Sequence, residues 1–129
     1  MDPVATVTQF LDLLAAGQAE EAVKLVADDI EWRNTGLPTL RGERVVWSLR
    51  EMERRRIRFH ADMHHIAADG DAVLTDRTDF LGIGRYESSF WVRGTFVVRD
   101  GLIVLWDDAF STGNVLMGSL RGLGRLFRR

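Results

Sequence analysis

Residues 64–81 read HHIAADGDAVLTDRTDFL. Asp69-Gly70 in the middle of this stretch is a strong signal for a tight turn between two antiparallel strands. The runs on either side, 64–68 and 72–81, are rich in residues that favour strands. The stretch therefore predicts a β-hairpin.

The rest of the chain completes an α+β pattern around this hairpin. Asp2-Pro3 supplies a capping side chain and a first-turn proline, and Gly17 ends the run of helical spacing that follows. A second turn signal, Asp100-Gly101, joins the last two strands. Helices followed by hairpin-linked strands predict an α+β domain. The predicted helices run from Asp2-Pro3 to Gly17, over 19–26 and over 42–55, and the predicted strands cover 30–34, 64–68, 72–81, 87–98 and 102–110.

The composition is that of an ordinary globular protein. Of 129 residues, 46% are hydrophobic and 28% are charged, and the formal net charge is −2. No strong positive field attracts nucleic acid or an anionic membrane, so we expect neither as a partner. Because the chain has no cysteine, it has no disulfide, thiol nucleophile or thiolate metal site.

The length predicts one domain over 1–112, followed by a tail over 113–129. The tail has the spacing of a weak amphipathic helix, which its glycines oppose. The N-terminus lacks the basic and apolar regions of a secretion signal, and no apolar run approaches the roughly 20 residues that cross a bilayer. We therefore expect a cytoplasmic protein with no membrane span.

Three pairs of polar or aromatic residues stand two positions apart within predicted strands. Residues at this spacing share a face of the sheet. Charged groups on otherwise apolar strands are costly to bury unless they pair with one another, and this cost suggests a site. The pairs are Arg77 and Asp79, Trp32 and Asn34, and Trp106 and Asp108.

These residues have the chemistry of an acid–base site. The guanidinium of Arg77 can bridge the carboxylates of Asp79 and Asp108. Two close carboxylates in a dry pocket do not both ionise easily, so one becomes a proton donor while the other stays a base. The amide of Asn34 can hold a water, whereas the indole of Trp32 can only donate a hydrogen bond.

A surface ion pair is the simpler alternative for Arg77 and Asp79. The alternation of residues 72–81 does not show which face is the core, so this alternative stays open on spacing alone. On the last strand, the bulkier face carries Trp106 and Asp108. We therefore expect Asp108 to be buried and Asp107 to be exposed.

Two stretches resemble the limonene-1,2-epoxide hydrolase family. Residues 64–79, HHIAADGDAVLTDRTD, look like its central hairpin, and residues 99–110, RDGLIVLWDDAF, resemble its last strand. The order of three helices, a strand with an aromatic-x-Asn element and then the sheet also matches. The resemblance covers residues 3–111. It implies a cone-shaped, curved antiparallel or mixed sheet with helices closing a deep pocket, the nuclear transport factor 2-like fold shared with ketosteroid isomerases.

The resemblance implies a one-step hydrolysis of a hydrophobic epoxide to a vicinal diol, without cofactor or metal. Asp108 resembles the base that deprotonates water, and Asp79 resembles the acid that protonates the epoxide oxygen. Arg77 resembles the bridge between them, and Asn34 resembles a ligand of the water. Where the family usually has a tyrosine, this chain has Trp32, which changes one contact of the water.

Further expectations concern the substrate and the assembly. Leu81 and Phe110 share strand faces with the two aspartates, and with Trp106 we expect them to contact the substrate. The resemblance implies a homodimer through the outer sheet face, where we expect Trp91 and Arg93. Two alternatives remain open: an isomerase or dehydratase of the same fold, and a noncatalytic protein that binds lipophilic ligands.

Two other signals have simpler explanations. His60 and His64 are four residues apart, as metal ligands on a helix are, but we expect a helix-to-strand transition between them and no metal site. Arg54-Arg55-Arg56 and Arg58 lie at a predicted helix end. Solvation and the helix dipole explain this basic run better than nucleic-acid binding.

Overall fold

The computed structural model describes residues 1–111, so the domain boundary predicted at residue 112 and the predicted tail over 113–129 lie outside the described residues. Two helices begin the chain, a third lies between the second and third strands, and four consecutive strands end the described part, which confirms the α+β class. The elements are α1 (Pro3–Ala15), α2 (Ala19–Ala22), the 3₁₀ turn η1 (Val23–Leu25), β1 (Val26–Asn34), β2 (Leu40–Arg41), α3 (Glu43–Arg54), β3 (Arg58–Asp69), β4 (Ala72–Ile83), β5 (Tyr86–Arg99) and β6 (Leu102–Ala109).

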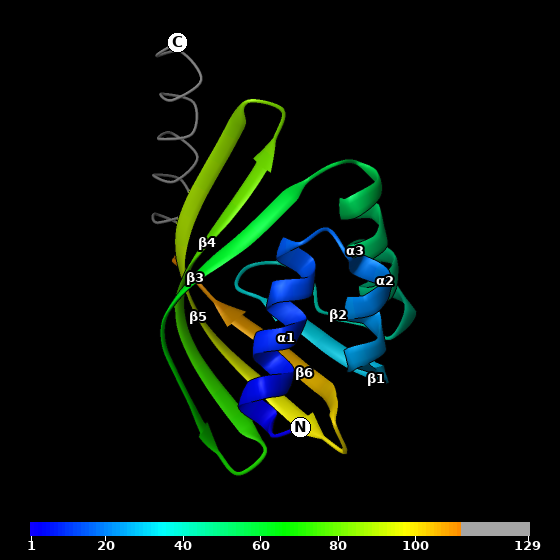
Figure 1. Cartoon of the computed structure of the whole chain (residues 1–129), viewed down its shortest axis with the longest axis vertical. Coiled ribbons are helices and arrows are strands. Elements are labelled where there is room, and N and C mark those ends of the chain that lie inside the picture. The colour runs from blue at the N-terminus through cyan, green and yellow to red at the C-terminus, as the bar shows by residue number, and fades with distance from the viewer. Residues whose placement is uncertain (112–129) are drawn as a thin grey trace.

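The strands form a six-stranded mixed sheet in the order β2-β1-β6-β5-β4-β3. β1 runs parallel to β6, and the other neighbouring strands pair antiparallel. Figure 1 shows β3, β4 and β5 as long, strongly curved strands, with the helices gathered on one side of the sheet. The curvature leaves a concave interior between the sheet and the helices.

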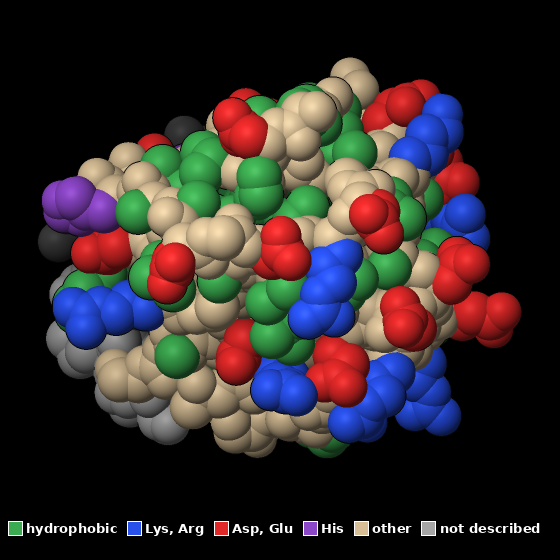
Figure 2. Space-filling view, turned by 90° about the horizontal axis from the view of Figure 1, so that it is seen from below, with side chains coloured by type: hydrophobic (Ala, Val, Ile, Leu, Met, Phe, Trp, Pro, Cys, Tyr) green, Lys and Arg blue, Asp and Glu red, His purple; other side chains and the backbone are tan. Residues whose placement is uncertain are grey.

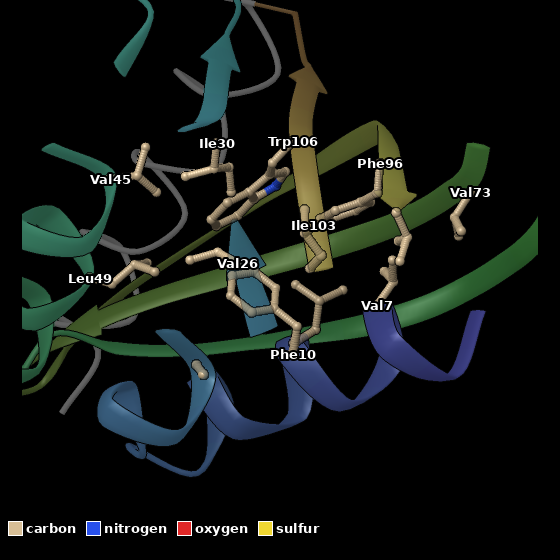
Figure 3. Packing of buried hydrophobic residues seen from close by; sticks show 13 residues of the cluster. Val7, Phe10, Val26, Ile30, Val45, Leu49, Val73, Phe96, Ile103 and Trp106 are labelled. Carbon is tan, nitrogen blue, oxygen red and sulfur yellow. The ribbon is translucent and has the colours of Figure 1, made fainter. Parts of the chain in front are cut away.

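Helix α1 supplies much of the apolar core. The side chain of Asp2 caps it by accepting a hydrogen bond of 2.7 Å from the Ala5 N–H, as the sequence predicted. Val7 and Phe10 are fully buried and point from α1 toward β5 and β6 (Figure 3). The ring of Phe10 meets the ring of Trp106 edge-on at 5.2 Å, so the helix packs directly onto the strand that carries Asp108.

The predicted helix over 19–26 is only partly correct. α2 ends at Ala22, η1 follows, and Val26 already begins β1. Residues 22–26 are apolar except for Lys24, and so short a stretch does not distinguish a helix from a strand. Pairing of Val26 with Ile103 on β6 favours the strand. The predicted helix over 42–55 is confirmed as α3, with Val45 and Leu49 buried.

Of the two predicted tight turns, one is confirmed and the other lies one residue later than predicted. Asp100 and Gly101 both have positive φ and form the predicted two-residue turn. In the earlier hairpin Asp69 pairs with Ala72, so the loop residues are Gly70 and Asp71, one position later than predicted.

A bulge in β6 changes which residues of the predicted bulky face point inward. The pairing of β5 with β6 shifts at Val104, which places Ile103 and Trp106 on the same side although they are three apart. Strict alternation would place Leu102, four residues before Trp106, on the same face as Trp106, but the bulge leaves Leu102 exposed. Beyond the bulge the alternation holds, and Asp108 is buried while the Asp107 side chain remains 43% exposed.

The two histidines at 60 and 64 are both part of β3, so the expected helix-to-strand transition between them is wrong. The ring of His60 stacks on Phe80, and His64 forms a hydrogen bond of 2.8 Å with Thr78. Within residues 1–111 no group of three metal-binding side chains lies close enough to hold an ion.

The surface is mixed in charge. On the face shown in Figure 2, basic and acidic side chains alternate, with no continuous basic patch. Arg54 and Arg55 of the basic run pair with Glu51 on their own helix. No helix in residues 1–111 is both long and apolar enough to cross a membrane.

Candidate active site

The register of the sheet brings the three residue pairs together. The parallel pairing of β1 with β6 sets Trp32 beside Trp106 and Asn34 beside Asp108. The two indole rings stack at 4.1 Å with an interplanar angle of 9°. The N-terminal and C-terminal strands thus contribute to one site.

Arg77 connects the two aspartates. Its Nε and Nη2 donate to the two oxygens of Asp79 at 2.8 and 3.0 Å, and Nη2 also donates to Asp108 Oδ2 at 2.7 Å. The Arg77 side chain is fully buried, and both aspartates are 5% exposed. The buried network therefore replaces the surface ion pair that spacing alone had left open.

Two more residues complete this network. Nη1 of Arg77 donates to Thr75 Oγ1 at 2.9 Å, and the indole of Trp106 donates to Asp108 Oδ2 at 2.9 Å. Trp106 lines the cavity, and its indole also holds Asp108, whereas its predicted contact with the substrate stays a prediction. Thr75 was not predicted as a site residue. It lies two residues before Arg77, as Asp79 lies two residues after it, so the same spacing rule could have indicated it.

The two oxygens of Asp108 have different surroundings. Oδ2 accepts from both Arg77 and Trp106, while Oδ1 is buried without a hydrogen-bond partner. Within residues 1–111, the other buried side-chain atom of this kind is Nε1 of Trp32. Buried polar atoms are normally satisfied, so this acceptor and this donor are both available to a polar ligand such as water.

The electrostatics favour a shared proton. Burial raises the pKa of Asp108 from 3.8 to about 6, although Arg77 opposes the shift. Burial also raises the pKa of Asp79, again against Arg77. The two carboxylates hold the pKa of Arg77 above its ordinary value despite its burial. One proton on the pair makes the cluster neutral, and the two carboxyls titrate as a unit.

An apolar cavity of about 280 Å³ opens in front of this cluster. Seven of the eight predicted site residues line it, and Arg77 lies behind them. Arg77 therefore contacts the two carboxylates but does not line the cavity. The predicted residues in the cavity wall are Trp32, Asn34, Asp79, Leu81, Trp106, Asp108 and Phe110, and further apolar walls come from Leu14, Leu49, Met52, Ile57, Phe59 and Phe90.

Comparison with known proteins agrees with this geometry. The family model described as the limonene-1,2-epoxide hydrolase catalytic domain matches residues 1–121. The chain belongs to the limonene-1,2-epoxide hydrolase family. It is similar to epoxide hydrolase EphG of Mycobacterium tuberculosis, with 40% identity over 117 residues that make up 91% of this chain and 78% of the relative.

Solved structures extend the comparison. The structure of an M. tuberculosis LEH-like epoxide hydrolase superposes with a TM-score of 0.92 at 40% identity, over 97% of this chain and 94% of that chain. A Pseudomonas putida protein provisionally described as a polyketide cyclase reaches 0.74 at 13% identity, over 92% of this chain and 98% of that chain, and shows the fold alone. The protein is therefore an enzyme, an epoxide hydrolase of the limonene-1,2-epoxide hydrolase type with the nuclear transport factor 2-like fold.

Proposed function

We propose that this enzyme adds water to a small hydrophobic epoxide in one step, with Asp108 as the base and Asp79 as the acid. The observation that carries the proposal is the asymmetry of Asp108. Arg77 and Trp106 hold Oδ2, while the buried Oδ1 has no partner and belongs to a residue of the cavity wall. An oxygen in this position is suited to take a proton from a bound water.

The proposed step keeps the buried cluster neutral. Asp108 Oδ1 takes a proton from water as the water oxygen bonds to an epoxide carbon. The carbon–oxygen bond of the ring breaks, and protonated Asp79 gives its proton to the departing oxygen. The proton count and the charge of the Asp79–Arg77–Asp108 cluster are the same before and after, so no net charge develops in the dry site. The cycle closes when Asp108 loses the proton that it took from water and Asp79 regains one, so that the cluster again holds a single proton on Asp79.

Trp32 and Asn34 are proposed to orient the water. An indole only donates, so the water accepts from Trp32 Nε1 and donates to Asp108 Oδ1 and to the amide oxygen of Asn34. One lone pair of the water then remains for the epoxide carbon. A tyrosine could either donate or accept at this position, whereas Trp32 permits one orientation.

The cavity supports a hydrophobic substrate. Its walls are apolar apart from a small polar group around the two aspartates and Glu53 at α3. A volume of about 280 Å³ suits a small molecule. The proposed step needs neither a metal nor an organic cofactor, because water and two carboxyls supply all the atoms that move.

A single-turnover reaction in water labelled with heavy oxygen tests the mechanism. With enzyme in excess over a hydrophobic epoxide, we expect the label in the diol from the first turnover. A covalent ester on Asp108 or Asp79 would instead deliver unlabelled carboxylate oxygen to that first diol. Unlabelled diol contradicts the one-step proposal, and an isomerised product without added water identifies the isomerase alternative.

Substitution of Trp32 tests the orientation of the water. Trp32→Phe removes the donor but keeps an aromatic ring beside Trp106, and we expect kcat to fall about tenfold, the value of one hydrogen bond. Trp32→Tyr restores a donor and should recover most of this loss. Equal kcat for the phenylalanine and tryptophan enzymes would exclude a hydrogen bond from residue 32 to the water.

The assembly and location stay predictions. We propose a homodimer through the outer sheet face, supported by two exposed apolar side chains there, Leu74 at 52% and Trp91 at 45%. Arg93 lies over the Trp91 ring at 4.3 Å. Sedimentation of the wild type and of Trp91→Glu tests this: a wild-type dimer that dissociates in the variant is expected. A cytoplasmic location also remains a prediction.

A further inference from the structure

The Arg77 side chain has to cross a strand to reach Asp108. β5 lies between β4, which carries Arg77, and β6, which carries Asp108. Two strand spacings separate β4 from β6, roughly 10 Å. On β5, Gly94 pairs with Thr75 on one side and with Asp108 on the other. The guanidinium therefore passes over Gly94.

No side chain fits at Gly94. A Cβ there would lie 2.4 Å from Arg77 Nη1, 2.6 Å from Asp108 Oδ1 and 2.9 Å from Thr75 Oγ1. All three residues are buried. A hydrogen bond joins Nη1 to Oγ1, and Asp108 is held through its other oxygen, Oδ2, so the three atoms have little room to move. The φ of Gly94 is not positive, so the backbone does not demand glycine. A glycine is present at position 94 because the Arg77 side chain needs the space. Glycine within a strand often marks a place where another group comes close to the backbone.

Thr75 holds the Nη1 end of the Arg77 guanidinium. Its Oγ1 accepts from Arg77 Nη1 at 2.9 Å and donates to the Gly94 carbonyl oxygen at 3.1 Å. The hydroxyl is therefore oriented by the same residue over which the arginine passes. With Nη1 occupied by Thr75, Nη2 is the nitrogen that bridges Asp79 and Asp108.

We infer that Gly94 and Thr75 are positioning residues, which hold Arg77 in the one placement that links the base to the acid. Neither residue has been assigned a role in the reaction above. Their effect on turnover rests on the proposed function, whereas their effect on the Asp108 carboxyl does not.

The charged groups around Asp108 define the expected shift. Arg77 and Asp79 face it from β4, Glu53 of α3 lines the same cavity, and His60 of β3 acts on Asp79. Arg77 is the charged group among these that favours the ionised form of Asp108, and the hydrogen bond from the uncharged Trp106 acts in the same direction. If Arg77 moves away, the pKa of Asp108 rises above its wild-type value, and the acid limb of the kcat profile moves to higher pH.

Two variants and two matched controls make the test. Gly94→Ala should lower kcat about 100-fold, the effect of misplacing a group by about 1 Å. Thr75→Val, which keeps the shape, should lower kcat about tenfold with little change in KM. Thr75→Ser keeps the hydroxyl and should rescue kcat. Gly82→Ala is the control for a strand glycine beside an arginine, because its Cβ would meet only the exposed, flexible end of Arg58.

The pKa of Asp108, measured by carbon NMR of labelled carboxyl groups, is the deciding readout. We expect it to rise in Gly94→Ala and Thr75→Val and to stay unchanged in Gly82→Ala and Thr75→Ser. Should Gly94→Ala fail to fold, Thr75→Val decides alone. An unchanged Asp108 pKa in the folded variants overturns the inference. If the wild type opens no epoxide but the pKa shifts as expected, the proposed function fails and the positioning role stands.

Discussion

Two tryptophan–aspartate pairs lie on opposite faces of the same sheet. Inside, the indole of Trp106 donates to Asp108; outside, the indole of Trp91 donates to Asp76. Each pair has an arginine near it, Arg77 inside and Arg93 over the Trp91 ring outside. The chemical groups are the same, and the environments are not.

The two aspartates titrate in opposite directions. Burial raises the pKa of Asp108 to about 6, beyond what Arg77 and Trp106 can offset. At Asp76 the hydrogen bond from Trp91 dominates, and the pKa falls below its ordinary value. Of the two aspartates, desolvation therefore outweighs hydrogen bonding only at the one on the inner, concave face of the sheet. Water exclusion, rather than residue type, separates a candidate catalytic pair from a surface pair.

The largest expected contrast is the effect of neutralising each aspartate. Asp108→Asn should lower kcat at least about 1,000-fold, because the base is lost while the shape is kept. Asp76→Asn should leave kcat within about twofold, as surface changes usually do. Steady-state rates on one hydrophobic epoxide, with melting temperatures as a folding check, compare the two. Equal losses of kcat in the two variants would contradict the assignment of the reaction to the inner face.

Removing the arginine from each face should lower the free energy of unfolding by different amounts, more on the inner face than on the outer face. Arg77→Leu leaves two buried carboxylates without their counter-ion and should cost about 3–5 kcal/mol of unfolding free energy. Arg93→Leu removes an exposed contact with Trp91 and should cost about 1 kcal/mol or less. Urea unfolding at neutral pH measures both. Similar costs would mean that Arg77 is not needed to compensate the buried charges.

The pH dependence of activity should follow the inner aspartate. Asp108 must be ionised to take a proton, and its pKa is about 6. As pH falls below this value, kcat should drop about tenfold per pH unit. Asp76, with its lowered pKa, stays ionised over that range. An activity that is flat down to pH 5 would contradict the assignment of this acid limb to Asp108 with its raised pKa.

The smallest contrast concerns the two indoles. Trp106→Phe removes a donor that lowers the pKa of Asp108, so that pKa should rise and kcat at neutral pH should fall a few-fold, about the value of one hydrogen bond. Trp91→Phe should leave kcat unchanged. Rate–pH profiles of both variants measure the difference. A loss in Trp106→Phe without any shift in the profile would assign Trp106 to substrate contact alone.

Local signals predicted the parts of the fold that depend on neighbouring residues. Asp2 and Pro3 start α1, and Asp100-Gly101 forms its turn, because caps and tight turns are fixed within a few residues. The end of α2 at Ala22 was missed. There the pairing of Val26 with a distant strand overrides helical spacing, and no local pattern reports that pairing.

In the candidate site, too, some contacts follow from neighbouring residues and others depend on the pairing of distant strands. Spacing within β4 places Arg77 beside Asp79, but only the sheet order brings Asp108 to the same arginine. The shift at Val104 is likewise invisible in the sequence, since residues 102–106 are all apolar and show no alternation that a bulge could interrupt. Gly94 could not be recognised beforehand, because its importance lies in a side chain that crosses it from another strand.

The parallel pairing of β1 with β6 also bears on how the enzyme forms. It ties residues 31–34 to residues 105–108, so the site closes only when the ends of the sheet sequence meet. Such distant contacts slow folding to roughly milliseconds or longer. During synthesis β6, which carries Asp108, leaves the ribosome after the other strands of the six-stranded sheet. Until then the chain holds Arg77 and the proposed acid Asp79 without the proposed base Asp108, so on this proposal an early stop before β6 yields an inactive product.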